Sequence, residues 1–431
     1  MKSKLVVNNF DLSDKVVKAT REKVSISVDG GKHIPVFTEE QVTPTVDVNV
    51  TSEVEFDTSI VWQVLKSTIT WAKAYGGSSG EATYGVTVAP NGDIIIAGYT
   101  YSFGTNGDAW VLRLDSDGNV KWQKAYGGSN YDVITAVAVA DNGDIIVAGY
   151  TDSFGAGSKD SWILRLDENG NVKWQKAYGG SGDEVITAVT VAPNGDIIIA
   201  GYTYSFGAGK ADFWALRLDS DGNVKWQKAY GGSEDDEAGG IAIALNGDII
   251  VVGYTKSFGA GKADFWALRL DSDGNVKWQK AYGGSEDDIA FAVAITENGD
   301  IIVAGYTLSF GTNGDAWVLR LDSDGNVKWQ KAYGGSGWDS VNAIVITDNG
   351  DIVVVGDTDS FGAGGRDFWA LKLDEEGNVS ASQLTVTDTN CTVTDTNCTV
   401  TDTNCTVTDT SCTVTDTNCT VTETDCVVTQ L

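Results

Sequence analysis

Acidic residues recur in this sequence at a spacing that could build a cation-binding ring. A carboxylate lies three residues after each of six Gly-Gly-Ser segments. The six residues are Glu81, Asp132, Glu184, Asp236, Asp288 and Asp339. If the segments close into a circle, the carboxylates would meet near the mouth of a central channel, where Ca²⁺, which prefers several oxygen ligands, could bind. The alternative, which we prefer, is that each carboxylate accepts backbone hydrogen bonds from its own loop.

A second acidic set recurs with the same spacing, and we expect it to brace a nearby Ser-Phe-Gly loop. Its members are Asp108, Asp160, Asp212, Asp264, Asp315 and Asp367. Signals for catalysis are weak, because the only histidine, His33, lies outside the repeats and neither a Ser-His-Asp triad nor a histidine metal cage can be built within them. Acidic pairs such as Asp287-Asp288 could serve a glycosidase, but they are more often solvated loop charge. We therefore predict no enzymatic activity.

These residues must be positioned by a unit of about 52 residues that occurs six times. Its opening tryptophan recurs at Trp71, Trp122, Trp174, Trp226, Trp278 and Trp329. Each unit holds four short apolar runs separated by turn sequences, which is the content of one four-stranded propeller blade. The sequence therefore predicts an all-β protein with a six-bladed β-propeller over residues 67–383. Tight Asn-Gly and Asp-Gly hairpins should lie on one face of the disc and longer loops on the other.

Packing and closure of the ring can also be predicted. The first strand of each unit has small residues, as the narrow centre of a propeller requires, and two tryptophans per unit suit the wide outer wedges between blades. The sixth unit lacks its final tryptophan, whereas an unmatched copy of that strand, residues 68–75, precedes the first unit. We expect this early strand to complete the last blade.

One turn of the repeat carries a family resemblance. The segment Leu114-Asp-Ser-Asp-Gly-Asn-Val-Lys-Trp122 resembles the tryptophan-docking motif of quinoprotein-type propellers. The whole unit is similar to propeller repeats of bacterial and archaeal surface proteins. The resemblance covers residues 67–383 and implies the fold more strongly than any function. No counterpart of the cofactor-binding and metal-binding residues of quinoprotein dehydrogenases occurs here, so the resemblance implies no cofactor.

Residues 1–66 are expected to form a separate β region. Residues 24–28 and 33–37 predict a β-hairpin, and a long stretch with alternating apolar residues follows. Its apolar positions are Val46, Val48, Val50, Val54, Phe56, Ile60, Trp62 and Val64. A single strand cannot bury such a face alone. The stretch should therefore lie on the propeller, join the hairpin, or pair with a neighbouring subunit as an assembly arm.

Residues 384–431, here called the tail, repeat Thr-Val-Thr-Asp-Thr-Asn-Cys and carry all six cysteines. A stacked β-solenoid, an extended β tail and a disordered tail are the alternatives. Metal binding is disfavoured because paired cysteines are lacking. Asn390, Asn397, Asn404 and Asn418 lie in N-glycosylation sequons, which matter only if the chain is exported.

Composition limits the partners. The formal net charge of −30 disfavours nucleic acid and anionic membranes. No apolar run reaches membrane-spanning length, and no signal peptide is evident. Our first hypothesis is a structural or adhesive protein of a cell or virion surface, which self-associates or binds another surface protein and forms a filament through its arm and tail. The alternative is a monomeric propeller that binds a carbohydrate or a cation. Without a visible leader, a cytoplasmic location stays open.

Overall fold

The computed structural model describes residues 71–362, 365–379, 384–403 and 405–409, and six further strands, Lys4–Leu5, Val24–Val28, Lys32–Val36, Val54–Glu55, Thr413–Asp416 and Thr420–Glu423. Every element within these ranges is a β-strand. Among the described residues, no helix has the length and apolar character needed to span a membrane. The chain divides into two units, Met1–Thr70 and Trp71–Leu431.

The described residues of the first unit form four strands. A hairpin of β2 (Val24–Val28) and β3 (Lys32–Val36) lies where the sequence predicts one, and β1 (Lys4–Leu5) pairs with β4 (Val54–Glu55). Of the predicted assembly arm, only Val54 falls in a described strand, where it is opposite Leu5. The other arm residues, Val46, Val48, Val50, Phe56, Ile60, Trp62 and Val64, lie outside the described residues.

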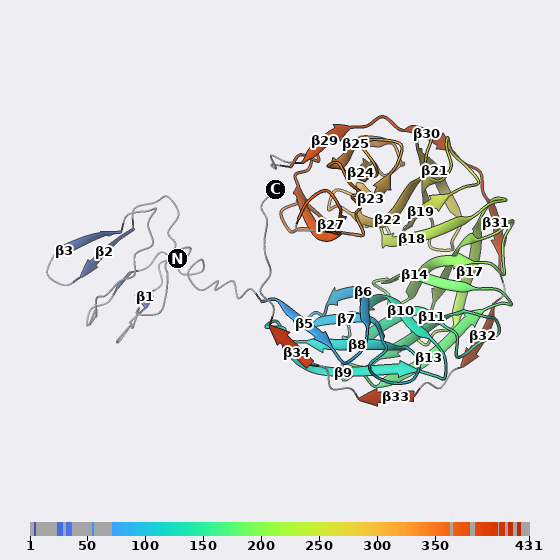
Figure 1. The fold of residues 1–431 in the computed structure, drawn as a ribbon, viewed down its shortest axis with the longest axis horizontal. Coiled ribbons are helices and arrows are strands. Elements are labelled where there is room, and N and C mark those ends of the chain that lie inside the picture. Colours follow the sequence, from blue (N-terminus) through green and yellow to red (C-terminus); the bar gives the residue numbers. More distant parts are fainter. Residues whose placement is uncertain are drawn as a thin grey trace. The chain divides into compact units, whose positions relative to one another are not determined.

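The second unit is the six-bladed β-propeller, as predicted (Figure 1). The first blade contains β6 (Glu81–Val88), β7 (Ile94–Thr100), β8 (Asp108–Leu114) and β9 (Val120–Gly127). The second contains β10 (Asp132–Val139), β11 (Ile145–Thr151), β12 (Asp160–Leu166) and β13 (Val172–Gly179). The third contains β14 (Glu184–Val191), β15 (Ile197–Thr203), β16 (Asp212–Leu218) and β17 (Val224–Gly231).

The remaining blades follow the same antiparallel order. The fourth contains β18 (Asp236–Ile243), β19 (Ile249–Thr255), β20 (Asp264–Leu270) and β21 (Val276–Gly283). The fifth contains β22 (Asp288–Ile295), β23 (Ile301–Thr307), β24 (Asp315–Leu321) and β25 (Val327–Gly334). The sixth contains β26 (Ala343–Ile346), β27 (Ile352–Thr358) and β28 (Asp367–Leu373).

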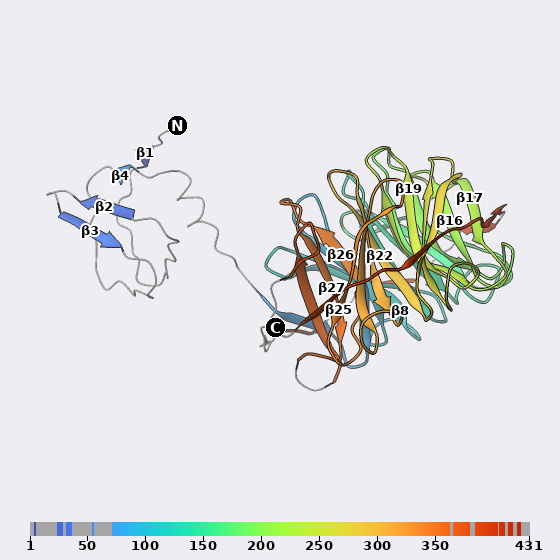
Figure 2. The ribbon, with the colours of Figure 1, turned by 90° about the horizontal axis from the view of Figure 1, so that it is seen from above.

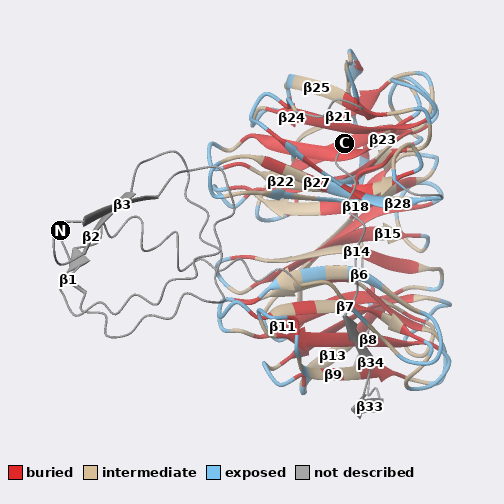
Figure 3. Ribbon diagram, turned by 60° about the vertical axis from the view of Figure 1, so that its left-hand side comes forward, coloured by how far each residue is buried: buried red, intermediate tan, exposed pale blue. Residues whose placement is uncertain are grey.

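Turn residues form the two hairpins of each blade. In the third blade, Gly195 and Gly222 have φ of 83° and 74°, which a side chain disfavours. The Asp219 carboxylate accepts hydrogen bonds from the backbone N–H of Asp221 (2.9 Å) and Asn223 (2.8 Å). Both hairpins lie on one side of the disc, here called the hairpin face. The opposite side, where the longer connections lie, is called the loop face. Buried residues run along the strands and exposed ones gather at the connections on both faces (Figure 3).

The core lies between adjacent blades and is dominated by aromatic side chains. Trp266 is fully buried, and the ring of Phe213 from the preceding blade lies 4.6 Å from it. The opening tryptophans of the repeats are only partly buried, and each donates its indole N–H to a turn carbonyl of the next blade, as Trp226 does to Ser272 O (2.9 Å). Both sets therefore join neighbouring blades, which agrees with their predicted role in packing.

The sixth junction differs from the prediction. The strand β5 (Lys73–Gly76) docks on the first blade, where Trp71 donates to Ser116 O (3.0 Å) and Tyr75 to Gly118 O (2.6 Å), as outer strands do at the other junctions. Among the described residues, however, β5 pairs with a tail strand and β28 pairs only with β27. Phe368 of β28 is consequently 92% exposed, whereas Phe265 at the same place in the fourth blade is 1% exposed. The early strand thus docks on the first blade, and among the described residues it does not complete the last one, so that prediction is wrong.

The tail winds around the rim of the disc (Figures 1 and 2). Its strands are β29 (Thr385–Asp388), β30 (Thr392–Asp395), β31 (Thr399–Asp402), β32 (Thr406–Asp409), β33 (Thr413–Asp416) and β34 (Thr420–Glu423). They pair in turn with β25, β21, β17, β13, β9 and β5. Tail strands thus pair with blades and not with one another. Of the predicted alternatives, the extended tail describes this arrangement, and the solenoid does not.

Candidate functional site on the loop face

The first predicted acidic set lies at the starts of the inner strands on the loop face. Asp132, Glu184, Asp236, Asp288 and Asp339 are fully buried, and Glu81 is half-buried. In the fifth blade, Asp288 Oδ2 accepts hydrogen bonds from Gly284 N (2.8 Å) and Ser309 Oγ (2.8 Å), and Oδ1 accepts one from Thr307 Oγ1. These bonds hold the connection before the strand and the loop after the next strand, as our preferred interpretation expects.

The second acidic set lies beside the first. Asp264 Oδ2 accepts from Ala260 N (2.8 Å) and Gly261 N (3.1 Å), so it braces the loop after Ser257-Phe258 as predicted. Its Oδ1 is buried and has no hydrogen-bond partner among the described residues. A Cβ on Gly283 would lie 1.6 Å from Asp264 Oδ1 and 2.8 Å from Asp288 Oδ2, so glycine leaves room for two neighbouring carboxylates.

This carboxylate pair recurs at five junctions between blades. The pairs are Asp108 with Asp132, Asp160 with Glu184, Asp212 with Asp236, Asp264 with Asp288, and Asp315 with Asp339. The pKa of Asp108, Asp212, Asp264 and Asp315 is raised to about 6. Burial is the main cause, and the neighbouring acid contributes to the same increase. Among the described residues, no three acidic, histidine or cysteine side chains come together as a metal site would need. The acids therefore form separate pairs and do not converge on one another.

Two positions of the repeat on the loop face carry residues that differ from blade to blade. In each blade, the residue before the buried acid accepts a backbone hydrogen bond from the residue after the second strand, as Tyr131 O does from Asp152 N (2.9 Å). Twelve residues occupy these two positions and are here called the loop-face ring. They are Gly80, Tyr101, Tyr131, Asp152, Asp183, Tyr204, Asp235, Lys256, Asp287, Leu308, Trp338 and Asp359. A rigid, repeated scaffold thus carries a ring whose chemistry changes from blade to blade.

Two members of the ring, Tyr101 and Tyr131, belong to a cluster of five tyrosines in the first two blades. The rings of Tyr101 and Tyr131 are nearly parallel (19°), with centroids 5.9 Å apart, and Tyr99 meets both edge-on at 5.3 and 5.5 Å. Tyr84 and Tyr150 extend the cluster. Tyr84 and Tyr101 are 59% and 52% exposed, so the cluster presents aromatic surface to solvent. Burial and neighbouring groups raise the pKa of Tyr150 to about 12, so the phenol is neutral at physiological pH.

Carboxylates and a second aromatic group lie at other positions of the loop-face ring or beside it. The pKa of Asp152 is raised, mainly by burial. The Lys159 ammonium partly opposes this increase, and the nearby Asp183 carboxylate adds to it. Lys159 Nζ lies 5.0 Å from the Tyr150 ring centre. Between the fifth and sixth blades, the ring centre of Trp338 lies 4.6 Å from that of Tyr306. The loop face therefore combines aromatic surfaces with hydrogen-bond acceptors.

Sequence reasoning did not identify the ring. A position-by-position comparison of the six copies would have found it. Its two positions of the repeat vary from copy to copy, whereas the flanking position is always Thr on one side and always Asp or Glu on the other. The predicted sequon residues Asn390 and Asn397 are exposed in the tail, whereas Asn404 and Asn418 lie outside the described residues.

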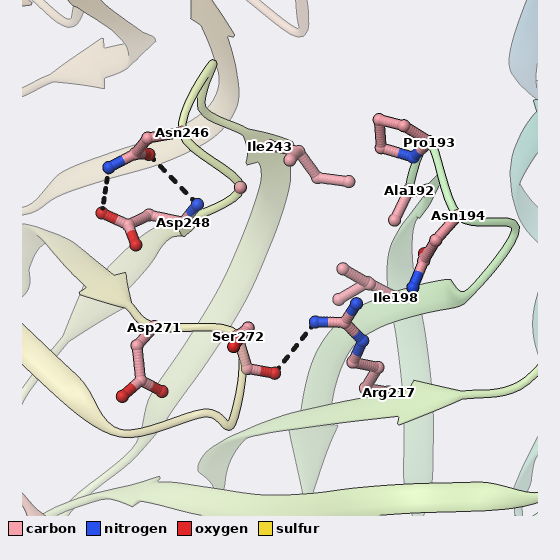
Figure 4. A pocket seen from close by; sticks show the side chains of 11 residues that line it. Ala192, Pro193, Asn194, Ile198, Arg217, Ile243, Asn246, Asp248, Asp271 and Ser272 are labelled. Carbon is pink, nitrogen blue, oxygen red and sulfur yellow. Dashed lines mark hydrogen bonds between the residues drawn. The ribbon is translucent and has the colours of Figure 1, made fainter.

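A pocket of about 330 Å³ lies on the hairpin face between the third and fourth blades (Figure 4). Arg217 crosses it, donating to Ser272 O (2.9 Å) and to Asp196 Oδ2 (2.8 Å). The same arginine contacts recur at the neighbouring junctions, as for Arg269 with Asp248 and Ser323 O. The pocket is thus one copy of a repeated structural joint, and the loop-face ring is the better candidate for a functional site.

Comparison with known proteins agrees with the fold. The family described as outer membrane protein assembly factor BamB matches residues 49–264, which is half of the chain. The chain belongs to this family. A second family, described as a β-propeller domain of unknown function, matches residues 296–327. The family assignment identifies the chain as a propeller repeat protein, and it assigns no ligand to the loop face.

Individual relatives are distant. The chain is 25% identical over 280 residues to the regulatory protein FlaEY of Caulobacter vibrioides, a match that covers 56% of this chain and 29% of the relative. A protein of unknown function from Dyadobacter fermentans is 13% identical with a TM-score of 0.47, covering 69% of this chain and 96% of its own. Virginiamycin B lyase of Staphylococcus aureus is 13% identical with a TM-score of 0.45, covering 74% and 88%. None of these likenesses assigns an activity to this chain.

Proposed function

We propose that the protein is a non-enzymatic adhesive protein of a cell or virion surface, and that the loop-face ring binds carbohydrate. The observation that carries the proposal is the tyrosine cluster, in which the nearly parallel rings of the exposed Tyr101 and the half-buried Tyr131 form an aromatic platform. The apolar C–H face of a sugar ring can stack on such a surface, and phenol groups at its edge can exchange hydrogen bonds with sugar hydroxyls. Asp152 and Asp183 add acceptors beside it.

The non-enzymatic part of the proposal is supported by the chemistry of the ring. The only histidine, His33, belongs to the first unit. The buried carboxylates nearest the ring are engaged with their own loops, as Asp132 is with Gly128 N (2.8 Å) and Ser153 Oγ (2.8 Å). A platform with bordering acceptors favours binding, whereas an acid and base aimed at one bond would favour hydrolysis.

The test is glycan-array binding by the full-length protein and three variants. Tyr101→Ala and Tyr131→Ala should each weaken binding at least about tenfold, since each removes half of the platform. Leu245→Ala is the matched control, because Leu245 is 77% exposed on the hairpin face and its loss should leave binding unchanged. Loss with Trp338→Ala alone would move the site to the second aromatic group. Absence of any glycan ligand, or release of cleaved sugar, would refute the proposal.

A further inference from the structure

We propose that the outer edges of the blades are equivalent binding sites for the tail heptad, and that the tail of a second copy of this chain can occupy them. This goes beyond the proposed carbohydrate binding, because it concerns the rim of the disc and a protein partner. The exchange of tails would link copies through pairings already present within one copy.

The first support is that the blades bind the heptads in one register. Gly334 is opposite Thr385 at the fifth blade, and Gly283 is opposite Thr392 at the fourth. The same offset recurs at every described pairing, including Gly76 with Thr420. Seven extended residues span about 23 Å, so one heptad carries the tail from one blade edge to the next.

A second support is a recurring side-chain contact set that recognises the heptad. Trp266 Nε1 donates to Thr396 Oγ1 (3.0 Å), and this hydroxyl donates to Gln279 Oε1 (3.0 Å). The same Gln279 oxygen accepts from Cys398 N (3.0 Å), and Gln279 O accepts from Thr396 N (3.3 Å). The third and fifth blades repeat these contacts with Thr403 and Thr389.

A third support is the burial of the heptad cysteines. Cys391, Cys398 and Cys405 are buried, each in an apolar cluster that also contains the tryptophan and tyrosine of neighbouring blades. Burial raises the pKa of Cys398 to about 12, so it is a protonated, apolar anchor. The described blade edges thus contact the threonine and the cysteine of the heptad in the same way.

Sequence identity makes these sites interchangeable. Five outer strands share Val-Lys-Trp-Gln-Lys-Ala-Tyr-Gly, and four heptads share Thr-Val-Thr-Asp-Thr-Asn-Cys. Because these five edges are identical to one another, as are these four heptads, pairing among them does not specify which heptad belongs to which blade. Covalent connection alone favours the chain's own tail, through its high effective concentration. Another copy's tail offers the same contacts at each edge.

The first experiment frees one edge of the full-length protein. Thr396→Pro removes the N–H that Gln279 O accepts and the hydroxyl between Trp266 and Gln279. A labelled peptide with the sequence of residues 392–403 should bind this variant and should bind wild type at least about tenfold more weakly. The matched control combines Thr396→Pro with Gln279→Ala and should lose about tenfold in peptide affinity. Binding no stronger than that of a scrambled peptide would overturn the proposal.

The second experiment uses wild type and does not depend on the folding of a variant. Copies with light and heavy nitrogen are mixed, incubated and cross-linked with a carbodiimide, which can join Lys331 to the opposite Asp388. Complete exchange would make half of these cross-linked pairs isotopically mixed. Mixed pairs that rise with incubation support exchange between copies. Pairs that stay unmixed at high protein concentration overturn it, even if the peptide binds Thr396→Pro.

Discussion

The carboxylate pairs predict that replacing one acid by its neutral amide stabilises the protein at neutral pH. Asp264 is fully buried and its Oδ1 has no hydrogen-bond partner, while Asp288 lies beside it. The pKa of Asp264 is raised from 3.8 to about 6, and each pKa unit corresponds to about 1.4 kcal/mol, so ionisation costs the folded state about 3 kcal/mol. The change is Asp264→Asn, whose Oδ1 keeps an acceptor for the loop and whose N–H groups can donate to Asp288.

The sign follows from linkage. A carboxyl whose folded pKa is raised contributes stability below its unfolded pKa, and that contribution is lost as pH rises through about 6. The melting temperature of Asp264→Asn should therefore match that of wild type near pH 4 and exceed it near pH 7.5. For a unit of this length, 3 kcal/mol corresponds to about 4 °C. The assay is differential scanning calorimetry of both proteins across this pH range.

A control of opposite sign lies in the same blade. The Asp271 carboxylate accepts hydrogen bonds from the Asn275 side chain and from the backbone N–H of Asn275 and Asp273, which lower its pKa, so Asp271→Asn should destabilise the protein at pH 7.5. If Asp264→Asn instead lowers the melting temperature at pH 7.5 as Asp271→Asn does, the charged form is favoured and the reasoning fails. Stabilisation of wild type by Ca²⁺, lost in Asp264→Asn, would identify a cation as the missing partner.

Three further predictions concern the blade core and the tail. Phe265→Ala should lower the free energy of unfolding, measured by calorimetry, by about 3–4 kcal/mol, because the Phe265 ring centre lies 4.5 Å from that of Trp317. Phe368→Ala should change the free energy of unfolding little, because Phe368 is 92% exposed. Equal losses would mean that the sixth junction closes in solution. Cys398 should resist a thiol reagent at pH 8 until the tail is released, because its pKa is about 12; rapid labelling of the native protein would contradict its buried position. Gly283→Ala should lower the melting temperature sharply, since its Cβ would lie 1.6 Å from Asp264 Oδ1, and an unchanged melting curve would contradict the tight carboxylate pair.

Local features of the fold were predictable because their causes are local. Asn-Gly-Asp turns supply residues with positive φ, as at Gly195, and alternation of side chains assigns each strand two faces. The loop-bracing role of the acids was predictable for the same reason, since Asp288 and Gly284 are close in the chain. The functional surface was not, because the Tyr101 and Tyr131 rings meet only when two blades stand side by side.

The amino-acid sequence by itself determined the number of blades, because the repeat can be counted. It also determined the strand order and the two chemically different faces, since both depend on residues within one repeat of about 52 positions. Only the tertiary structure decided where the tail lies and which acids become neighbours. Asp264 and Asp288 belong to different blades, and Thr396 lies 117 residues from Gln279. Such contacts depend on the radius of the ring and on the edge that each blade leaves unpaired. These contacts cannot be predicted from any one segment of the sequence, because they form only when the blades have packed around a common axis.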